Sequence, residues 1–246
     1  MQIIEPYLEL AGIVLLTIIG IFYIIISLKL FKSWKLKQLR STMIFAIGFL
    51  FASLGLFGLT AEKIFLAYIY PHPIGDVFGR LSAIIGIVMS IGALLSLNAF
   101  TLEMALEKHK KKAFPPITVI GIIPTTILIY AISTYIAIID NHEFVYPFWI
   151  TLIMVCMIFP VMIFPPIVFF YYSIKIRKVD KANYKRSITM GIAMLTLAIT
   201  YTIELAGASL ILAILFRLGF FIFAILMYVS IELPDWYRKL IGWSEE

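Results

Sequence analysis

The amino-acid sequence predicts an all-α, polytopic membrane protein built as a bundle of seven transmembrane helices. Hydrophobic residues make up 62% of the 246-residue chain, compared with about 45–50% in soluble domains. The excess runs along the whole chain, in stretches long enough to cross the roughly 30 Å hydrocarbon core of a bilayer. Charged residues amount to 14% and gather in short tracts between these stretches. The net charge of +6 therefore indicates a membrane rather than a nucleic-acid partner.

Seven apolar runs are long enough to be transmembrane helices. The first carries Glu5 and Glu9 and lacks the basic start of a signal peptide, so we count it as a span. The last break, after Glu204, is short, but one helix over 187–231 would be about 67 Å long, twice the thickness of a bilayer. A transmembrane domain over 1–231 is followed by a short interfacial tail at 232–246. The predicted spans are 9–30, 43–69, 77–104, 116–139, 147–173, 187–205 and 208–231.

The positions of the basic residues predict the orientation of the bundle. Of 20 lysine and arginine residues, 17 fall in four tracts, 29–40, 108–112, 175–186 and 238–239, which share one side if there are seven spans. The loops on the other side, at 71–76 and 140–146, contain none. The positive-inside rule then places the N-terminus outside and the tail in the cytoplasm of a multi-pass protein of the cell membrane. Six spans would put basic tracts on both sides, so we disfavour that count.

The tail has two interpretations. Pro234 suits a first helical turn, and Trp236, Leu240 and Trp243 can share one apolar face of a short helix lying in the membrane interface. The alternative is a frayed tail held at the interface by tryptophan.

Two parts of the sequence resemble each other, which predicts a parallel 3+1+3 repeat. Residues 27–41 match 173–187 at a constant offset of 146, with coinciding serine, lysine and arginine positions. Later, Glu62 and Glu204 each end a Thr-x-Glu triplet, and Arg80 and Arg217 each precede a leucine. Spans 1–3 would then correspond to spans 5–7, with span 4 as a linker. The alternative is that lysine-rich loops are alike by composition alone.

Charged residues inside the spans are the candidate site residues. A charge at the bilayer centre costs about 2.5–3.5 kcal/mol on insertion scales, so Arg217 should face the bundle or a wet cavity. Its preferred partner is Glu204, followed by Glu62 and then Glu9. Thr200 lies on the same helical stripe as Glu204.

The repeat predicts that Glu62 pairs with Arg80 in the same way. Asp76, four residues before Arg80, is a local competitor. Towards the other end of that span, Asn98 and Glu103 could form a separate polar site, or Glu103 could pair with the basic loop 108–112.

These residues allow two interpretations. They could line an outward-facing pocket for a small polar or anionic ligand, formed by Glu62, Arg80, Thr200, Glu204 and Arg217. They could instead form two ion pairs that brace the bundle. We predict no metal, because His72 and His142 lack ligand spacing. We predict no cofactor either, since the last span has no lysine to hold retinal.

The sequence lacks the common catalytic motifs HExxH, GxSxG, CxxC, GxGxxG and the Walker loop, so we predict that the protein is not an enzyme. The span order ending in "YVSIELPDWYRKLIGW" resembles the seven-helix sensor region at the N-terminus of some archaeal and bacterial membrane histidine kinases. That resemblance implies a sensor-like fold, and the sequence up to Glu246 contains no kinase. The 3+1+3 plan is similar to that of SWEET-type sugar transporters, but their Pro-Gln pair is missing here.

The main functional prediction is therefore a receptor-like, sensory module that binds a small ligand in its outer half. It would signal through a separate cytoplasmic protein at the basic loops. The alternative is a small-solute transporter with two half-repeats, and the charged cluster argues against a purely structural subunit. A pocket closed below the arginines would favour sensing. A polar path reaching the inner face would favour transport.

Overall fold

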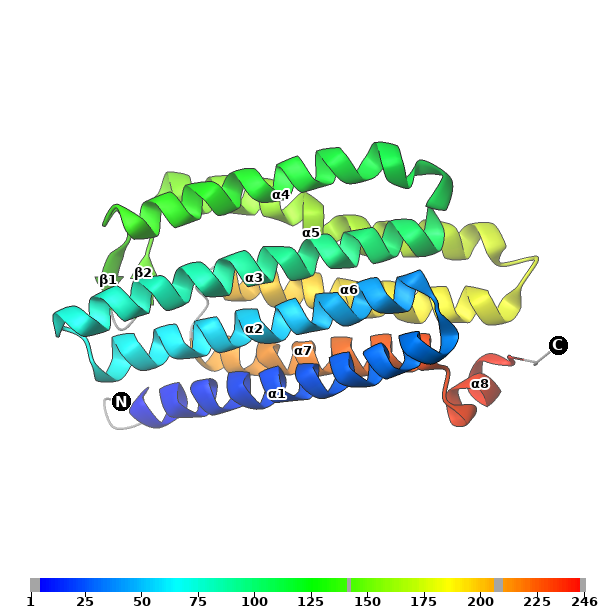
Figure 1. Cartoon of the computed structure of the whole chain (residues 1–246), viewed down its shortest axis with the longest axis horizontal. Helices are drawn as coiled ribbons and strands as arrows, with labels where there is room; N and C mark the ends of the chain where they lie inside the picture. The colour runs from blue at the N-terminus through cyan, green and yellow to red at the C-terminus, as the bar shows by residue number, and fades with distance from the viewer. Residues whose placement is uncertain (1–4, 141–142, 206–209, 244–246) are drawn as a thin grey trace.

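The computed structural model describes residues 5–140, 143–205 and 210–243, which form an all-α bundle (Figure 1). Among them, seven helices are long and apolar enough to cross a membrane, which confirms the predicted number of spans. The elements in chain order are α1 (Glu5–Lys37), α2 (Arg40–Tyr68), α3 (Pro73–Ala105), the 3-10 turn η1 (Glu107–His109), α4 (Lys110–Ser133), β1 (Ile138–Asp140), β2 (Glu143–Val145), α5 (Phe148–Ile176), α6 (Lys181–Leu205), α7 (Leu210–Glu232) and α8 (Asp235–Ile241).

The two ends of the bundle differ in chemistry. At one end lie the β1–β2 hairpin, the α2–α3 turn and the start of α1, and we name it the hairpin end (Figure 1). At the other lie the α1–α2, α3–α4 and α5–α6 connections and α8, which carry the four basic tracts (Figure 1). We name this the basic end. The assignment of these ends to the two sides of a membrane stays a prediction.

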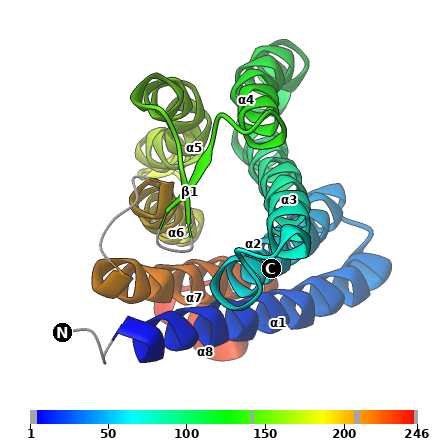
Figure 2. The same cartoon turned by 90° about the vertical axis from the view of Figure 1, so that its left-hand side faces the viewer.

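The seven helices form a ring. Each packs on the next along the chain, α1 closes the ring against α7, and α3 also contacts α5. The view from the hairpin end shows α3 and α4 on one side and α5 and α6 on the other, with the hairpin between them (Figure 2). The α2–α3 pair is packed most closely, because glycines face each other: a Cβ on Gly58 would lie 2.6 Å from the Cα of Gly86.

The helix bounds differ from the predicted spans mainly around α4. We predicted a span over 116–139, but α4 ends at Ser133, and Tyr135 adopts a positive φ of 59° that a helix cannot continue through. The predicted loop 140–146 is part of a hairpin, in which Ile138 pairs with Val145 and Ile139 with Phe144. At the basic end, α1 and α5 continue beyond the predicted spans because their lysine-bearing turns stay helical outside the apolar run.

The tail forms a short helix, α8, in line with the first of its two interpretations, and its position in a membrane interface stays a prediction. The helix runs from Asp235 to Ile241 and is followed by Gly242, whose φ of 75° suits a glycine. Tyr237 and Ile241 are buried against the bundle, and the Tyr237 hydroxyl donates a hydrogen bond to Thr189 Oγ1 on α6 (2.9 Å). Trp236 and Leu240 share the exposed face. The third predicted member of that face, Trp243, is instead partly buried, with its ring 5.8 Å from the guanidinium carbon of Arg186.

Candidate functional site

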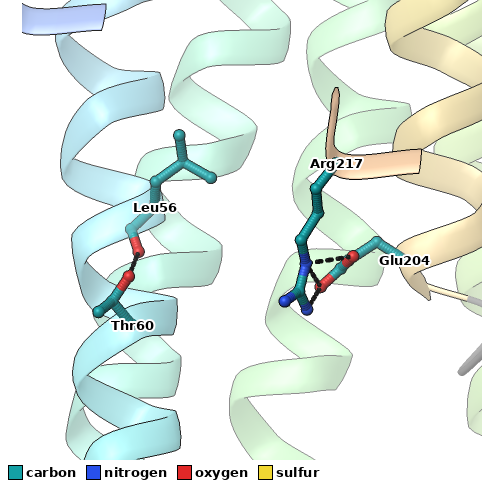
Figure 3. Close-up of polar contacts among 4 residues, drawn as sticks. All are labelled: Leu56, Thr60, Glu204 and Arg217. Carbon is teal, nitrogen blue, oxygen red and sulfur yellow. Dashed lines mark hydrogen bonds and ion pairs between the residues drawn. The ribbon is translucent and has the colours of Figure 1, made fainter. Parts of the chain in front are cut away.

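Arg217 and Glu204 form an ion pair between α7 and α6, as predicted. The Nε of Arg217 donates to both carboxylate oxygens of Glu204, at 3.2 and 3.1 Å, and its Nη2 donates to Oε1 (Figure 3). Only 2% of Arg217 is exposed. Gly12 on α1 makes room for the guanidinium, because a Cβ there would lie 2.6 Å from Nη1. The pair therefore joins three helices at one point.

Arg80 takes the local partner rather than the one that the repeat predicts. Its Nε donates to Asp76 Oδ1 at 2.8 Å. Its two Nη groups donate to the backbone carbonyls of Ile132 and Ala137, at 2.5 and 3.3 Å. The guanidinium also lies 4.3 Å from the ring centre of Tyr135. Arg80 thus fixes the end of α4 and the start of the hairpin to α3.

A cavity of about 480 Å³ lies between the helices at the hairpin end. It reaches the surface beside Asp140, which is exposed, and the hairpin residues Phe144, Val145 and Tyr146 form part of its wall. The other described lining residues come from five helices: Leu59, Glu62 and Lys63 of α2, Ile87, Ser90, Ile91 and Leu94 of α3, Thr125 and Leu128 of α4, Met154 and Ile158 of α5, and Tyr201 and Glu204 of α6.

The cavity brings together two of the five predicted site residues. Glu62 and Glu204 both line it, whereas the described lining includes neither arginine, since Arg80 and Arg217 lie behind their own partners. Thr200 is also outside the described lining. It is 2% exposed and packs against α7, where a Cβ at Gly219 would overlap its hydroxyl oxygen. The helical stripe that Thr200 shares with Glu204 predicts a position facing a ligand, but the same face of α6 packs against α7 at Gly219.

The lining of this cavity is acidic. Its described members include three carboxylates, Glu62, Asp140 and Glu204, and one cation, Lys63. The pKa of the Tyr146 hydroxyl is raised, first by burial and then by the negative charge of Glu62, so this phenol stays protonated. Sequence reasoning missed Asp140, Tyr146 and Tyr201, because only the hairpin and the rotation of α6 bring them to the cavity.

A smaller, apolar chamber of about 60 Å³ adjoins this cavity on the side of the bundle centre. The two share Leu59, Ser90, Leu94, Tyr201 and Glu204 in their walls. The rest of the chamber is lined mostly by aromatic and aliphatic side chains, among them Tyr23, Phe45, Phe49, Phe220 and Phe223. The Tyr23 hydroxyl donates to the Phe220 carbonyl at 2.9 Å.

Aromatic packing closes the chamber towards the basic end. Phe45, Phe100 and Phe169, from three different helices, are each 2% exposed or less. The ring centres of Phe45 and Phe100 are 4.7 Å apart, and those of Phe100 and Phe169 are 6.1 Å apart. Phe45 therefore packs against Phe100, and Phe100 packs against Phe169.

Asn98 bonds to a carbonyl that a proline leaves free. Pro165 has no N–H, so the carbonyl of Val161 lacks its helical donor. The Nδ2 of Asn98 donates to that carbonyl at 3.0 Å and to Leu94 O at 2.8 Å. Asn98 Oδ1 is buried without a partner among the described residues. A cavity of about 10 Å³ adjoins Asn98 and shares Leu94, Leu97 and Leu197 with the apolar chamber.

Glu103 belongs to the basic loop rather than to a site with Asn98. Its Oε2 accepts a hydrogen bond from Lys110 at 2.8 Å, which confirms the second of the two predicted roles. Among the described residues, no three histidine, cysteine or acidic side chains are grouped so that they could hold a metal ion.

The two halves of the proposed repeat agree in part. Thr60 donates to the carbonyl four residues earlier in its own helix at 2.8 Å (Figure 3), and Thr202 does the same at 2.7 Å. Glu62 and Glu204 both line the same cavity. The arginines differ, since the ion pair of Arg80 lies within α3 and the ion pair of Arg217 joins two helices. The repeat stays a prediction. Comparison with protein-family models, curated proteins and solved structures found no match for the chain.

Proposed function

We propose that this protein is a receptor-like, sensory module of the cell membrane, which binds a small ligand at its hairpin end and signals through a separate protein at its basic end. One observation carries the proposal: the cavity has the exposed Asp140 in its wall at the hairpin end, and on its inner side it adjoins an apolar chamber that packed aromatic rings bound towards the basic end. A blind pocket suits recognition, whereas transport needs access from both sides. The positive-inside rule supports an external hairpin end, and the proposal includes no catalysis.

The Glu204–Arg217 pair offers a route from ligand to output. Glu204 lines both the cavity and the chamber, and Arg217 carries the contact to α7. At its other end, α7 leads into α8, and Arg186 of α6 donates to the Ser230 carbonyl of α7 at 2.7 Å. A ligand that binds differently to two positions of α6 would therefore shift α7 and α8 together. The resemblance of the sequence at 228–243 to the exit of kinase sensor regions supports the same direction of output.

A second candidate function is small-solute transport. The small cavity at Asn98 adjoins the apolar chamber, with which it shares Leu94, Leu97 and Leu197. Pro165 and Pro166 weaken the hydrogen bonding of α5 beside it. A helix broken at this depth can act as a hinge. These features favour a transporter if the aromatic layer around Phe100 can open.

Cysteine accessibility distinguishes the two functions without a known ligand. In a Cys156→Ser background, Ser90→Cys, Leu94→Cys and Thr101→Cys would be treated with a membrane-impermeant thiol reagent from each side of oriented vesicles. A sensor predicts that Ser90→Cys reacts only from the hairpin end and Thr101→Cys from neither side. Reaction of Leu94→Cys or Thr101→Cys from both sides would contradict the sensor and support transport.

A further inference from the structure

We propose that the ligand of this site is a small amphipathic amine, with its cationic head in the acidic cavity and its apolar tail in the aromatic chamber. The inference rests on the proposed function only in taking the cavity to be a ligand site. It is carried by two adjoining spaces of opposite chemistry that share Ser90, Tyr201 and Glu204 in their walls.

The charges that face the cavity select the head group. Glu204 is paired with Arg217. The other charged residues of the described lining are two carboxylates, Glu62 and Asp140, and one cation, Lys63, so the described lining has a net negative charge. Arg80 could attract an anion, but its charge is engaged by Asp76 and by two carbonyls. A cleft whose walls have one sign of charge concentrates ligands of the other sign. A protonated amine therefore fits, and a carboxylate or phosphate does not.

Neutral groups complete the surroundings of the head. Four residues that carry hydroxyl groups, Ser90, Thr125, Tyr146 and Tyr201, line the same cavity. Each can accept a hydrogen bond, and an ammonium group has three N–H bonds to donate. Tyr146 remains a neutral phenol, because burial raises its pKa. The site can thus satisfy a primary ammonium with one carboxylate and two hydroxyls.

The chamber selects the tail. Ser90, Tyr201 and Glu204 stand at the boundary that the two spaces share, and beyond them the lining is almost entirely apolar. With about 60 Å³ of free space, the chamber holds only a short chain or small ring. Each added methylene should tighten binding about threefold to fourfold until the chamber is full, and the rings of Phe49 and Phe223 would contact its end.

The test uses the full chain in nanodiscs of zwitterionic lipid, with empty nanodiscs subtracted. The probes are propylamine, butylamine, pentylamine and hexylamine, with 1-hexanol and hexanoate as matched neutral and anionic compounds. Affinities would be taken from ligand-induced shifts in melting temperature. We expect affinity to rise along the amines, hexylamine to bind at least tenfold more tightly than hexanoate, and hexanol to lie between them.

Two pairs of variants separate the head from the tail. Glu62→Gln and Asp140→Asn should each weaken hexylamine about threefold to tenfold and leave hexanol unchanged. Their control is Glu107→Gln, because the Glu107 side chain is 73% exposed at the basic end. Ala52→Leu, or the smaller Ala52→Val, should fill the chamber and abolish the dependence on chain length. Val88→Leu, on an exposed face of α3, controls for added bulk.

The outcomes decide between the proposals. Tighter binding of hexanoate, equal binding in Glu62→Gln and Asp140→Asn, or no binding by any probe would overturn the amine proposal. If the amines bind as expected and deep cysteines react from both sides, the ligand class stands and the sensory function fails. The two proposals can therefore fail separately.

Discussion

The two buried arginines, Arg217 and Arg80, solve the same problem in different ways. Both must satisfy a guanidinium within a span, where an unpaired charge is costly. Arg217 relies on one carboxylate from another helix, and only 2% of it is exposed. Arg80 spreads its donors over Asp76 and two backbone carbonyls and leaves 11% of its side chain exposed. The first arrangement couples helices beside a cavity, and the second fastens a hairpin.

This comparison teaches that a charged residue in a span does not by its presence mark a ligand site. Both arginines stand behind their acceptors, and the cavity is lined by Glu204 and Glu62 instead. The arginines hold in place the groups that line the cavity. Arg217 holds Glu204, and Arg80 holds the hairpin that forms one wall of the cavity. The stability of the bundle should therefore depend more on the partner of Arg217 than on the partners of Arg80.

The largest effect should come from Glu204→Gln. This change leaves the Arg217 guanidinium buried without its carboxylate, and breaking a buried pair costs about 3–5 kcal/mol. The free energy of unfolding would be measured by SDS titration in mixed micelles. Glu107→Gln is the matched control, since its weak exposed contact with Lys110 (3.6 Å) should contribute about 0–1 kcal/mol.

A loss below about 1 kcal/mol for Glu204→Gln would show that the buried pair is no more valuable than a surface pair. The double variant Glu204→Leu/Arg217→Met provides a further check. Removing both charges together should restore most of the lost stability, because no buried charge remains.

The next effect should come from Arg80→Met, at about 2–3 kcal/mol. The change removes an ion pair and two hydrogen bonds from a charged donor, but Asp76, whose side chain is 19% exposed, stays partly hydrated. Hydrogen exchange should become faster at residues 134–140 and 143–145, which Arg80 holds to α3. Arg80→Lys should lie between the wild type and Arg80→Met, because an ammonium cannot reproduce the fork of donors. Unchanged exchange in the hairpin would refute its role as an anchor.

The fold was largely predictable from sequence because length and apolarity determine which segments can span a bilayer. All seven spans overlap the helices that form, and the weak break after Glu204 does separate α6 from α7. The hairpin was not predictable in the same way. Its strands are three residues each, and the end of α4 depends on a positive φ at Tyr135, for which the sequence carries no glycine or asparagine as a signal.

The site was predictable only where its partners lie close together in the sequence. Glu204 and Arg217 are 13 residues apart, near the facing ends of consecutive helices, so their nearness in the sequence predicts the pair. The acceptors of Arg80 are carbonyls of Ile132 and Ala137, and side-chain patterns carry no information about backbone atoms. The cavity depends on the rotation of five helices, which periodicity alone does not fix.

A smaller effect should come from Gly12→Ala, at about 1–2 kcal/mol. The new Cβ would lie 2.6 Å from Arg217 Nη1, so the guanidinium must shift within its slot, as in an overpacked core. In an Arg217→Met background the same change should be nearly neutral, because the flexible side chain can yield. A double-mutant cycle on the unfolding free energies measures this coupling. Equal effects in both backgrounds would mean that Gly12 serves helix packing rather than the arginine.

The smallest effect should come from Asp180, which lies outside the spans, in the α5–α6 turn. Its Oδ1 accepts a hydrogen bond from the Asn183 backbone N–H at 2.9 Å, and its Oδ2 accepts one from the Asn183 side chain at 2.6 Å. Asp180→Ala removes this cap of α6 and should cost about 1 kcal/mol. Asp180→Ala should cost less than Glu204→Gln because water can replace the hydrogen bonds of Asp180, whereas Arg217 would stay buried without its carboxylate.

Unlike the other three changes, this one carries a defined dependence on pH. The two hydrogen bonds lower the pKa of Asp180, the backbone donor contributing most. A carboxyl group whose pKa is lower in the folded state stabilises it above the unfolded pKa of about 4, and this stabilisation is lost as the pH falls through the folded pKa. The difference in unfolding free energy between the wild type and Asp180→Ala should therefore be constant from pH 5 to 8, on the order of 1 kcal/mol, and shrink below about pH 4. Asp180→Asn keeps an acceptor but no titrating group, so it should retain part of the cap without this dependence. A difference between the wild type and Asp180→Ala that stays the same down to about pH 2 would mean that the charge on Asp180 has no part in capping α6.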